Sequence, residues 1–137
     1  MRRTAVFFAS LLLAFPSLAG EAQIKAAQSS ISGQLHAFRA DDNATAYSYA
    51  APNVKRIFPT LDTFMGMVSG AYKPVHKPQS FSFGKFQEMS PNSIVQQVII
   101  VGADGKDYEA LYTLELQPDG VWRITGVSLR AANSLST

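Results

Sequence analysis

The stretch that decides the fold is SIVQQVIIVGADGKDYEALYTLELQPDGVWRITGVSL, residues 93–129. Two tight-turn signals divide it into three apolar runs. The first, Ala103-Asp104-Gly105-Lys106, contains the Asp-Gly pair that favours a hairpin, and the second is Pro118-Asp119-Gly120. The stretch therefore predicts three consecutive antiparallel strands, at Val95–Val101, at Tyr108–Leu116 and from Trp122 onward.

Two glycines interrupt the alternation of apolar residues in this C-terminal half. Gly126 separates Trp122 and Ile124 from the next apolar pair, Val127 and Leu129. In a further strand upstream, Gly84 separates Phe81 and Phe83 from Phe86, and a bulge there would bring the three rings to one side. Breaks of this kind predict a sheet that is bent by bulges.

The N-terminal half has a helical spacing of three and four residues. Asp41-Asp42-Asn43 offers capping oxygens to a second helix at 44–49. A short helical segment at 53–58 and a third main helix from Leu61 to Tyr72 follow, and two prolines in 73–78 predict an exposed connector. The first helix, at 24–39, has Gly33 opposite an apolar stripe formed by Ile24, Ala27, Ile31, Leu35 and Phe38.

Helices followed by four meandering strands predict an α+β fold, with N-terminal helices packed on a curved four-stranded antiparallel sheet. The length fits one domain, at 20–137. There is no cysteine, so a hydrophobic core rather than disulfides must stabilise the fold.

Residues 1–19 have the order of a secretory signal peptide. A basic start at Arg2-Arg3 precedes an apolar run of 11 residues, Ala5–Phe15, and Ser17-Leu18-Ala19 supplies a small-residue cleavage site. We expect cleavage after Ala19, with Ala22 as the alternative, and a protein that is periplasmic or secreted. A retained N-terminal anchor is the less favoured alternative, because the apolar run is too short to span a bilayer.

The predicted leader also accounts for the net charge. The chain has 12 Lys+Arg and 10 Asp+Glu, and the excess is Arg2 and Arg3. Residues 20–137 would then be neutral, without the basic surface that nucleic-acid binding requires. The absence of cysteine excludes a lipoprotein anchor, thiol catalysis and thiolate metal sites.

No set of residues points to a catalytic site. Asp41 and Asp42 could be a base or ligand at a pocket edge, but their position favours a helix cap. His36 and His76 lie 40 positions apart, so we expect no metal site, and no motif implies a cofactor. Tyrosines combine an apolar ring with a hydroxyl, and as core residues or cavity lining they are the candidate ligand-binding residues: Tyr47, Tyr49, Tyr72, Tyr108 and Tyr112.

Three stretches carry a resemblance: ISGQLHAFRADDNATAYSYAAP (31–52), FPTLDTFMGMVSGAY (58–72) and GVWRITGV (120–127). They resemble the nuclear-transport-factor-2-like superfamily, which includes the ketosteroid isomerases, and within it an uncharacterised family of secreted bacterial domains of unknown function. The resemblance implies a cone with a cavity between the first helix and the sheet. Some superfamily members are isomerases or dehydratases and many are noncatalytic, so the fold alone does not fix the function.

Three functions remain as hypotheses. The first is a noncatalytic periplasmic domain that binds a small apolar ligand or a protein partner in the cavity. The second is an isomerase or dehydratase using Tyr and Asp as acid–base groups, which requires a buried carboxylate near a tyrosine hydroxyl. The third is an interaction module that uses the basic segments 55–56 and 73–77, at an anionic membrane surface for instance. Members of the superfamily often dimerise through the outer sheet face, where Leu111, Thr113 and Glu115 would lie, and the sequence leaves the oligomeric state open.

Overall fold

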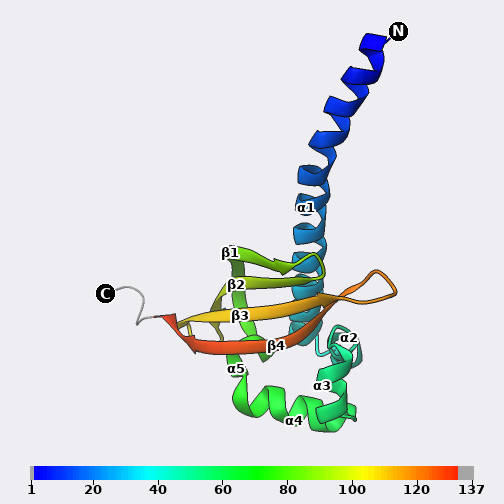
Figure 1. Cartoon of the computed structure of the whole chain (residues 1–137). Helices are drawn as coiled ribbons and strands as arrows, with labels where there is room; N and C mark the ends of the chain where they lie inside the picture. The colour runs from blue at the N-terminus through cyan, green and yellow to red at the C-terminus, as the bar shows by residue number, and fades with distance from the viewer. Residues whose placement is uncertain (1, 133–137) are drawn as a thin grey trace.

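The structure, a computed structural model, describes residues 2–132, with side chains from Gly20 to Ala132. Helices come first and a four-stranded antiparallel sheet follows, which confirms the predicted α+β class (Figure 1). No helix in the described part of the chain has the length and apolar character needed to cross a membrane. The helices are α1 (Arg2–Arg39), α2 (Asn43–Ser48), α3 (Pro52–Ile57), α4 (Leu61–Ala71) and α5 (Lys73–His76).

The sheet has the order β1-β2-β3-β4, so each strand pairs with its neighbour in sequence. Gly105 and Gly120, in the two turns that the sequence predicted, have φ values of 79° and 84°, which glycine adopts without a Cβ penalty. Their conformation is that expected of tight hairpin turns. The strands are β1 (Pro78–Ser90), β2 (Ser93–Gly102), β3 (Asp107–Leu116) and β4 (Trp122–Ala131).

Both predicted bulges are present. The β1–β2 register shifts between Phe83 and Phe86, and Phe81 and Phe83 lie opposite Ile100 and Val98. Phe86 lies opposite Gln96, which belongs to the same alternating buried face as Val98, so the three phenylalanines share one face of the sheet. In β4 the register shifts beside Gly126, as its sequence position indicated.

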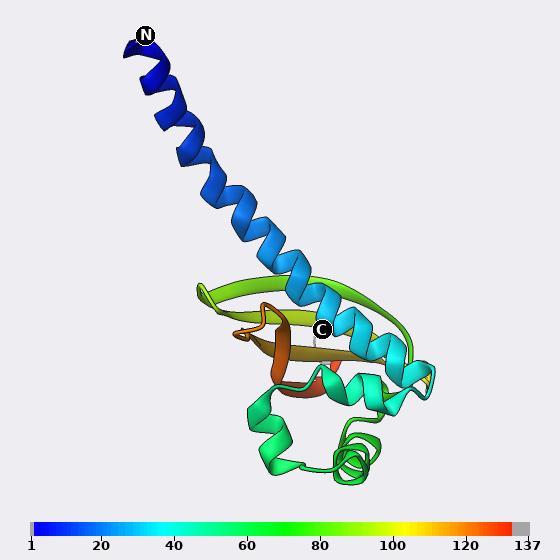
Figure 2. The same cartoon turned by 90° about the vertical axis from the view of Figure 1, so that its right-hand side faces the viewer.

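Helix α1 crosses one face of the sheet, and its N-terminal half extends past the sheet (Figure 2). Two polar tethers supplement its apolar stripe: Trp122 Nε1 donates to Gln23 Oε1 at 2.9 Å, and Ser30 Oγ donates to the Trp122 carbonyl at 2.6 Å. The core formed between α1 and the sheet includes Ala27, Ile31, Leu35, Phe38, Ile94, Val98, Ile100, Ala110, Tyr112, Leu114, Trp122 and Ile124.

The segment predicted to be an exposed connector is instead structured, which corrects the expectation for 73–78. Lys73–His76 forms the short helix α5, whose early proline is compatible with a first turn because the missing N–H would have no partner there. Val75 in this helix is only 3% exposed and packs into the core. Packing of α5 against β1 and β2 thus overrides the local signal of the prolines.

Candidate functional site

A pocket of about 260 Å³ opens between the smaller helices and β4. The end of α1 and helix α3 form one side, α4 and α5 another, and the irregular segment of β4 around Gly126 closes the sheet side. Most of its lining is apolar: Phe38, Ala50, Val54, Ile57, Phe58, Phe64, Met67, Val68, Val75, Ile124 and Val127.

Three polar side chains of the lining donate hydrogen bonds to backbone carbonyls, whereas the Thr125 hydroxyl donates to Thr113 Oγ1 at 2.8 Å and Asn53 Oδ1 is buried without a partner in the described part of the chain. Gln34 Nε2 donates to the Ala46 carbonyl at 3.0 Å, and Asn53 Nδ2 donates to the Thr125 carbonyl at 3.1 Å. Tyr72 donates from its hydroxyl to the Val127 carbonyl at 3.2 Å. These groups position α1, α3 and α4 around the pocket, and they leave an interior that is suited to apolar matter.

Of the five tyrosines that the sequence singled out, Tyr72 lines this pocket. Tyr47 is outside the lining and contacts two residues of it: its ring centroid is 4.8 Å from that of Phe64, and its hydroxyl donates to the Phe58 carbonyl at 2.5 Å. Tyr49 packs against α1 at Gly33, where an added Cβ would clash with the Tyr49 hydroxyl and ring. Gly33, predicted only to lie opposite the apolar stripe, is therefore the contact point for Tyr49.

The other two tyrosines are on β3. Tyr108 lies at the β2–β3 turn, where it donates to Asp104 Oδ2 at 2.7 Å. Tyr112 is fully buried in the core, and burial raises the pKa of its hydroxyl. That hydroxyl has no hydrogen-bond partner in the described part of the chain. The sequence could place these residues on faces but not at a pocket.

The pocket offers no acid–base pair. Among the described residues that line it there is no aspartate, glutamate or histidine. The Tyr108–Asp104 contact belongs to an exposed turn, and the pKa of Asp104 is lowered mainly by that hydrogen bond, the opposite of what a general acid needs. The isomerase or dehydratase hypothesis required a carboxylate beside a tyrosine inside the pocket, so this geometry does not support it.

Asp41 and Asp42 join α1 to α2, as the cap interpretation predicted. Asp42 Oδ1 accepts from the Thr45 N–H at 3.3 Å and caps α2. Asp41 has a φ of 59°, the left-handed conformation that commonly ends a helix, and the Asp42 N–H donates back to the Ala37 carbonyl at 2.8 Å. Asp41 also pairs with Lys77, which lowers the pKa of its carboxyl group.

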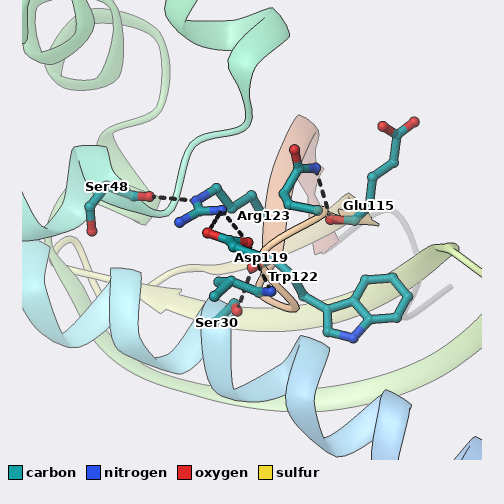
Figure 3. Close-up of polar contacts among 8 residues, drawn as sticks. Ser30, Ser48, Glu115, Asp119, Trp122 and Arg123 are labelled. Carbon is teal, nitrogen blue, oxygen red and sulfur yellow. Dashed lines mark hydrogen bonds and ion pairs between the residues drawn. The ribbon is translucent and has the colours of Figure 1, made fainter.

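A second, polar hollow of about 250 Å³ shares Asn53 and Thr125 with the lining of the pocket. Arg123, from β4, holds the nearby β3–β4 turn to α2: its Nη1 contacts Asp119 Oδ2 at 3.0 Å and its Nε donates to the Ser48 carbonyl at 3.2 Å (Figure 3). The hollow is lined by Ala51, Pro52, Asn53, Arg56, Glu115, Gln117 and Thr125.

The basic segments are held by different contacts. Lys55 lies over the Tyr47 ring, 5.2 Å from its centroid, whereas Lys77 donates to Asp41 and to the Phe38 carbonyl at the end of α1. Arg56 belongs to the polar hollow. These separate engagements count against a single free basic face at 55–56 and 73–77.

His76 lies in α5, next to the pocket-lining Val75, and its surroundings predict a stability that depends on pH. Its ring packs edge-on against Phe38, with the ring centroids 5.9 Å apart. Burial lowers the pKa of His76 below its ordinary value of 6.5, and the positive charge of Lys77 adds to this effect, while the negative charge of Asp41 opposes it. A histidine with a lowered folded-state pKa binds fewer protons than in the unfolded chain, so its stabilising contribution is complete above pH 6.5 and is lost as the pH falls toward the folded-state pKa.

We therefore expect a smaller free energy of unfolding at about pH 5.5 than at about pH 7.5. Urea denaturation of the wild type and of His76→Gln at both pH values measures it. The difference in the free energy of unfolding between the two pH values should be smaller in His76→Gln than in wild type. His36→Gln, at an exposed histidine, should retain the wild-type difference. The same difference in His76→Gln as in wild type would show that His76 does not cause the pH dependence.

Comparison with known proteins gives a family and a fold. No curated protein shows significant similarity to the chain. A solved structure from Catenulispora acidiphila has 15% sequence identity and a TM-score of 0.51, over 85% of this chain and 97% of that one, which supports the arrangement of helices and sheet. The family described as a domain of unknown function, DUF4864, matches residues 20–137. Since this match covers all of the chain after the predicted leader, the protein belongs to the DUF4864 family.

Proposed function

We propose that this chain is a noncatalytic binding domain that works outside the cytoplasm and holds a small apolar ligand in the pocket between α3, α4, α5 and β4. The observation that carries the proposal is the mainly apolar pocket itself, in which the amide groups of Gln34 and Asn53 and the Tyr72 hydroxyl donate to backbone carbonyls. Apolar cavities remain dry and accept apolar molecules, because water inside them would lack hydrogen-bond partners.

The volume limits the size of the ligand. An apolar cavity of about 150 Å³ accommodates benzene, and pockets for drug-sized molecules start at about 300 Å³. At about 260 Å³, this pocket suits a substituted single ring or a short alkyl chain. Phe38, Phe58 and Phe64 offer ring faces and edges to such a molecule.

The proposal includes the export and the superfamily that the sequence suggested. The basic, apolar and small-residue order of residues 1–19 supports removal of a leader and a periplasmic or secreted location. Helices preceding a four-stranded meander with two bulges are compatible with the cone of the nuclear-transport-factor-2-like superfamily. The pocket could bind an apolar ligand whether or not the chain is exported or belongs to this superfamily.

Native mass spectrometry of protein purified from the periplasm tests the proposal. We expect a fraction of the wild-type protein to carry a small molecule. Met67→Trp should abolish this fraction, because Met67 lines the pocket and indole would fill it. The mass of the protein itself also reports cleavage after Ala19 or Ala22.

Met65→Trp is the matched control, since Met65 lies two positions away on α4, packs on the core and is outside the pocket lining. It should retain the co-purifying molecule. An empty wild-type protein, or equal occupancy in Met67→Trp and wild type, would contradict binding in this pocket.

A further inference from the structure

The polar hollow and the apolar pocket share a wall. Asn53 and Thr125 line both spaces, and the hydrogen bond from Asn53 Nδ2 to the Thr125 carbonyl, 3.1 Å long, joins α3 to β4 between them. The pocket on one side is mainly apolar, whereas the hollow on the other has two charged side chains, Arg56 and Glu115. A molecule that crosses this boundary would meet two different chemical environments.

One face of α3 spans both spaces. Asn53, Arg56 and Ile57 are three and four residues apart, which places them on the same side of a helix. Ile57 lines the apolar pocket yet is 69% exposed, so it lies at the pocket mouth. Arg56, the preceding residue, lines the polar hollow. Apolar and cationic groups are thus adjacent where a ligand would enter.

Arg56 is the available cation at this mouth. Its guanidinium makes no hydrogen bond or ion pair with any residue from 20 to 132, while the neighbouring Lys55 contacts the Tyr47 ring and Arg123 is bonded to Asp119. Helix α3 contains no acidic residue. Glu115 lies on the β3 side of the hollow, opposite Arg123 in the strand register, and its carboxylate points away from that arginine (Figure 3).

We propose that the ligand is an amphipathic carboxylate, with an apolar body in the pocket and its carboxylate group on Arg56 in the hollow. This inference rests on the proposed function, because it assumes that the apolar pocket is occupied. A guanidinium group can bind a carboxylate with two parallel hydrogen bonds, which gives the ligand an orientation as well as affinity.

Three compounds with the same ring and chain test the inference: 4-phenylbutyrate, 4-phenylbutanol and 4-phenylbutylamine. In isothermal titration calorimetry, we expect the carboxylate to bind wild-type protein about fivefold more tightly than the alcohol, as suits an ion pair at an exposed arginine. Arg56→Gln should remove this difference and leave the affinity for the alcohol unchanged. Glu115→Gln should increase the difference, because it removes the carboxylate opposite the bound anion.

Lys106→Gln is the control for a general loss of positive charge, since Lys106 lies in the β2–β3 turn, away from both spaces. It should retain the preference for the carboxylate. Equal binding of carboxylate and alcohol to wild type, tighter binding of the amine, or a preference that survives in Arg56→Gln would overturn the inference and leave the apolar pocket as the ligand site. Failure of all three compounds to bind wild type would instead contradict the proposed function, and this inference with it.

Discussion

Trp122→Ala should lower the free energy of unfolding by about 3–5 kcal/mol, the usual cost of removing a large aromatic side chain from a core. Trp122 is 2% exposed and is the largest of the fully buried side chains. Its ring also ties β4 to α1 through Gln23, so the substitution removes a hydrogen bond as well as packing. Chemical denaturation followed by far-ultraviolet circular dichroism measures the change.

Two neighbouring variants separate these contributions. Trp122→Phe keeps much of the ring volume and loses the hydrogen bond to Gln23, so its free energy of unfolding should lie between those of the wild type and Trp122→Ala. Val121→Ala, at a side chain that is 38% exposed, should change stability by no more than about 0.5 kcal/mol. A loss below about 1 kcal/mol in Trp122→Ala would be incompatible with the packing seen around β4.

Gln96→Leu should destabilise the fold by about 1–3 kcal/mol, although it replaces a buried polar residue with an apolar one. Gln96 is 0% exposed, and its Oε1 accepts from Gln28 Nε2 on α1 at 3.0 Å. Its Nε2 lies within hydrogen-bonding distance of three carbonyls, those of Gly84, Lys85 and Gln97. Leucine would leave the Gln28 amide and the carbonyls of the β1 bulge without this partner.

Val98→Leu is a suitable comparison because Val98 is buried on the same face of β2 and has no side-chain hydrogen bond to lose. Val98→Leu reports the effect of extra side-chain volume on stability. The loss of stability in Gln96→Leu should be larger than the loss in Val98→Leu. The amide protons near the Gly84 bulge should also exchange faster in Gln96→Leu. Greater stability of Gln96→Leu than of wild type would show that the buried amide is not a structural link.

The sheet could be predicted closely from the sequence because its signals are local. Alternation over 108–116, the Asp-Gly turn at Gly105 and the phase change at Gly126 each depend on a few adjacent residues. The apolar stripe of α1 was equally readable, and four of its five members are at most 1% exposed: Ala27, Ile31, Leu35 and Phe38.

The pocket could not be predicted in the same way, because it depends on where separate elements meet. Alternation placed Tyr112 on the inner face, but whether its ring reaches a pocket or fills the core depends on α1 above it. The sequence marked Arg56 only as part of a basic segment and did not single out Asn53, since their place beside the pocket comes from the position of α3 against β4. The spacing of Asn53, Arg56 and Ile57 on one helical face was the available clue.

Because Gln23 accepts a hydrogen bond from Trp122, the position of leader cleavage would affect how well this contact is held. A new chain start carries a positive α-amino group, which is unfavourable at the positive end of a helix dipole. Cutting after Ala19 would keep Glu21 in the first turn, where its negative charge compensates, and would leave three residues between the new chain end and Gln23. Cutting after Ala22 would discard Glu21 and make Gln23 the terminal residue, so the indole of Trp122 would depend on the least ordered position of the mature chain.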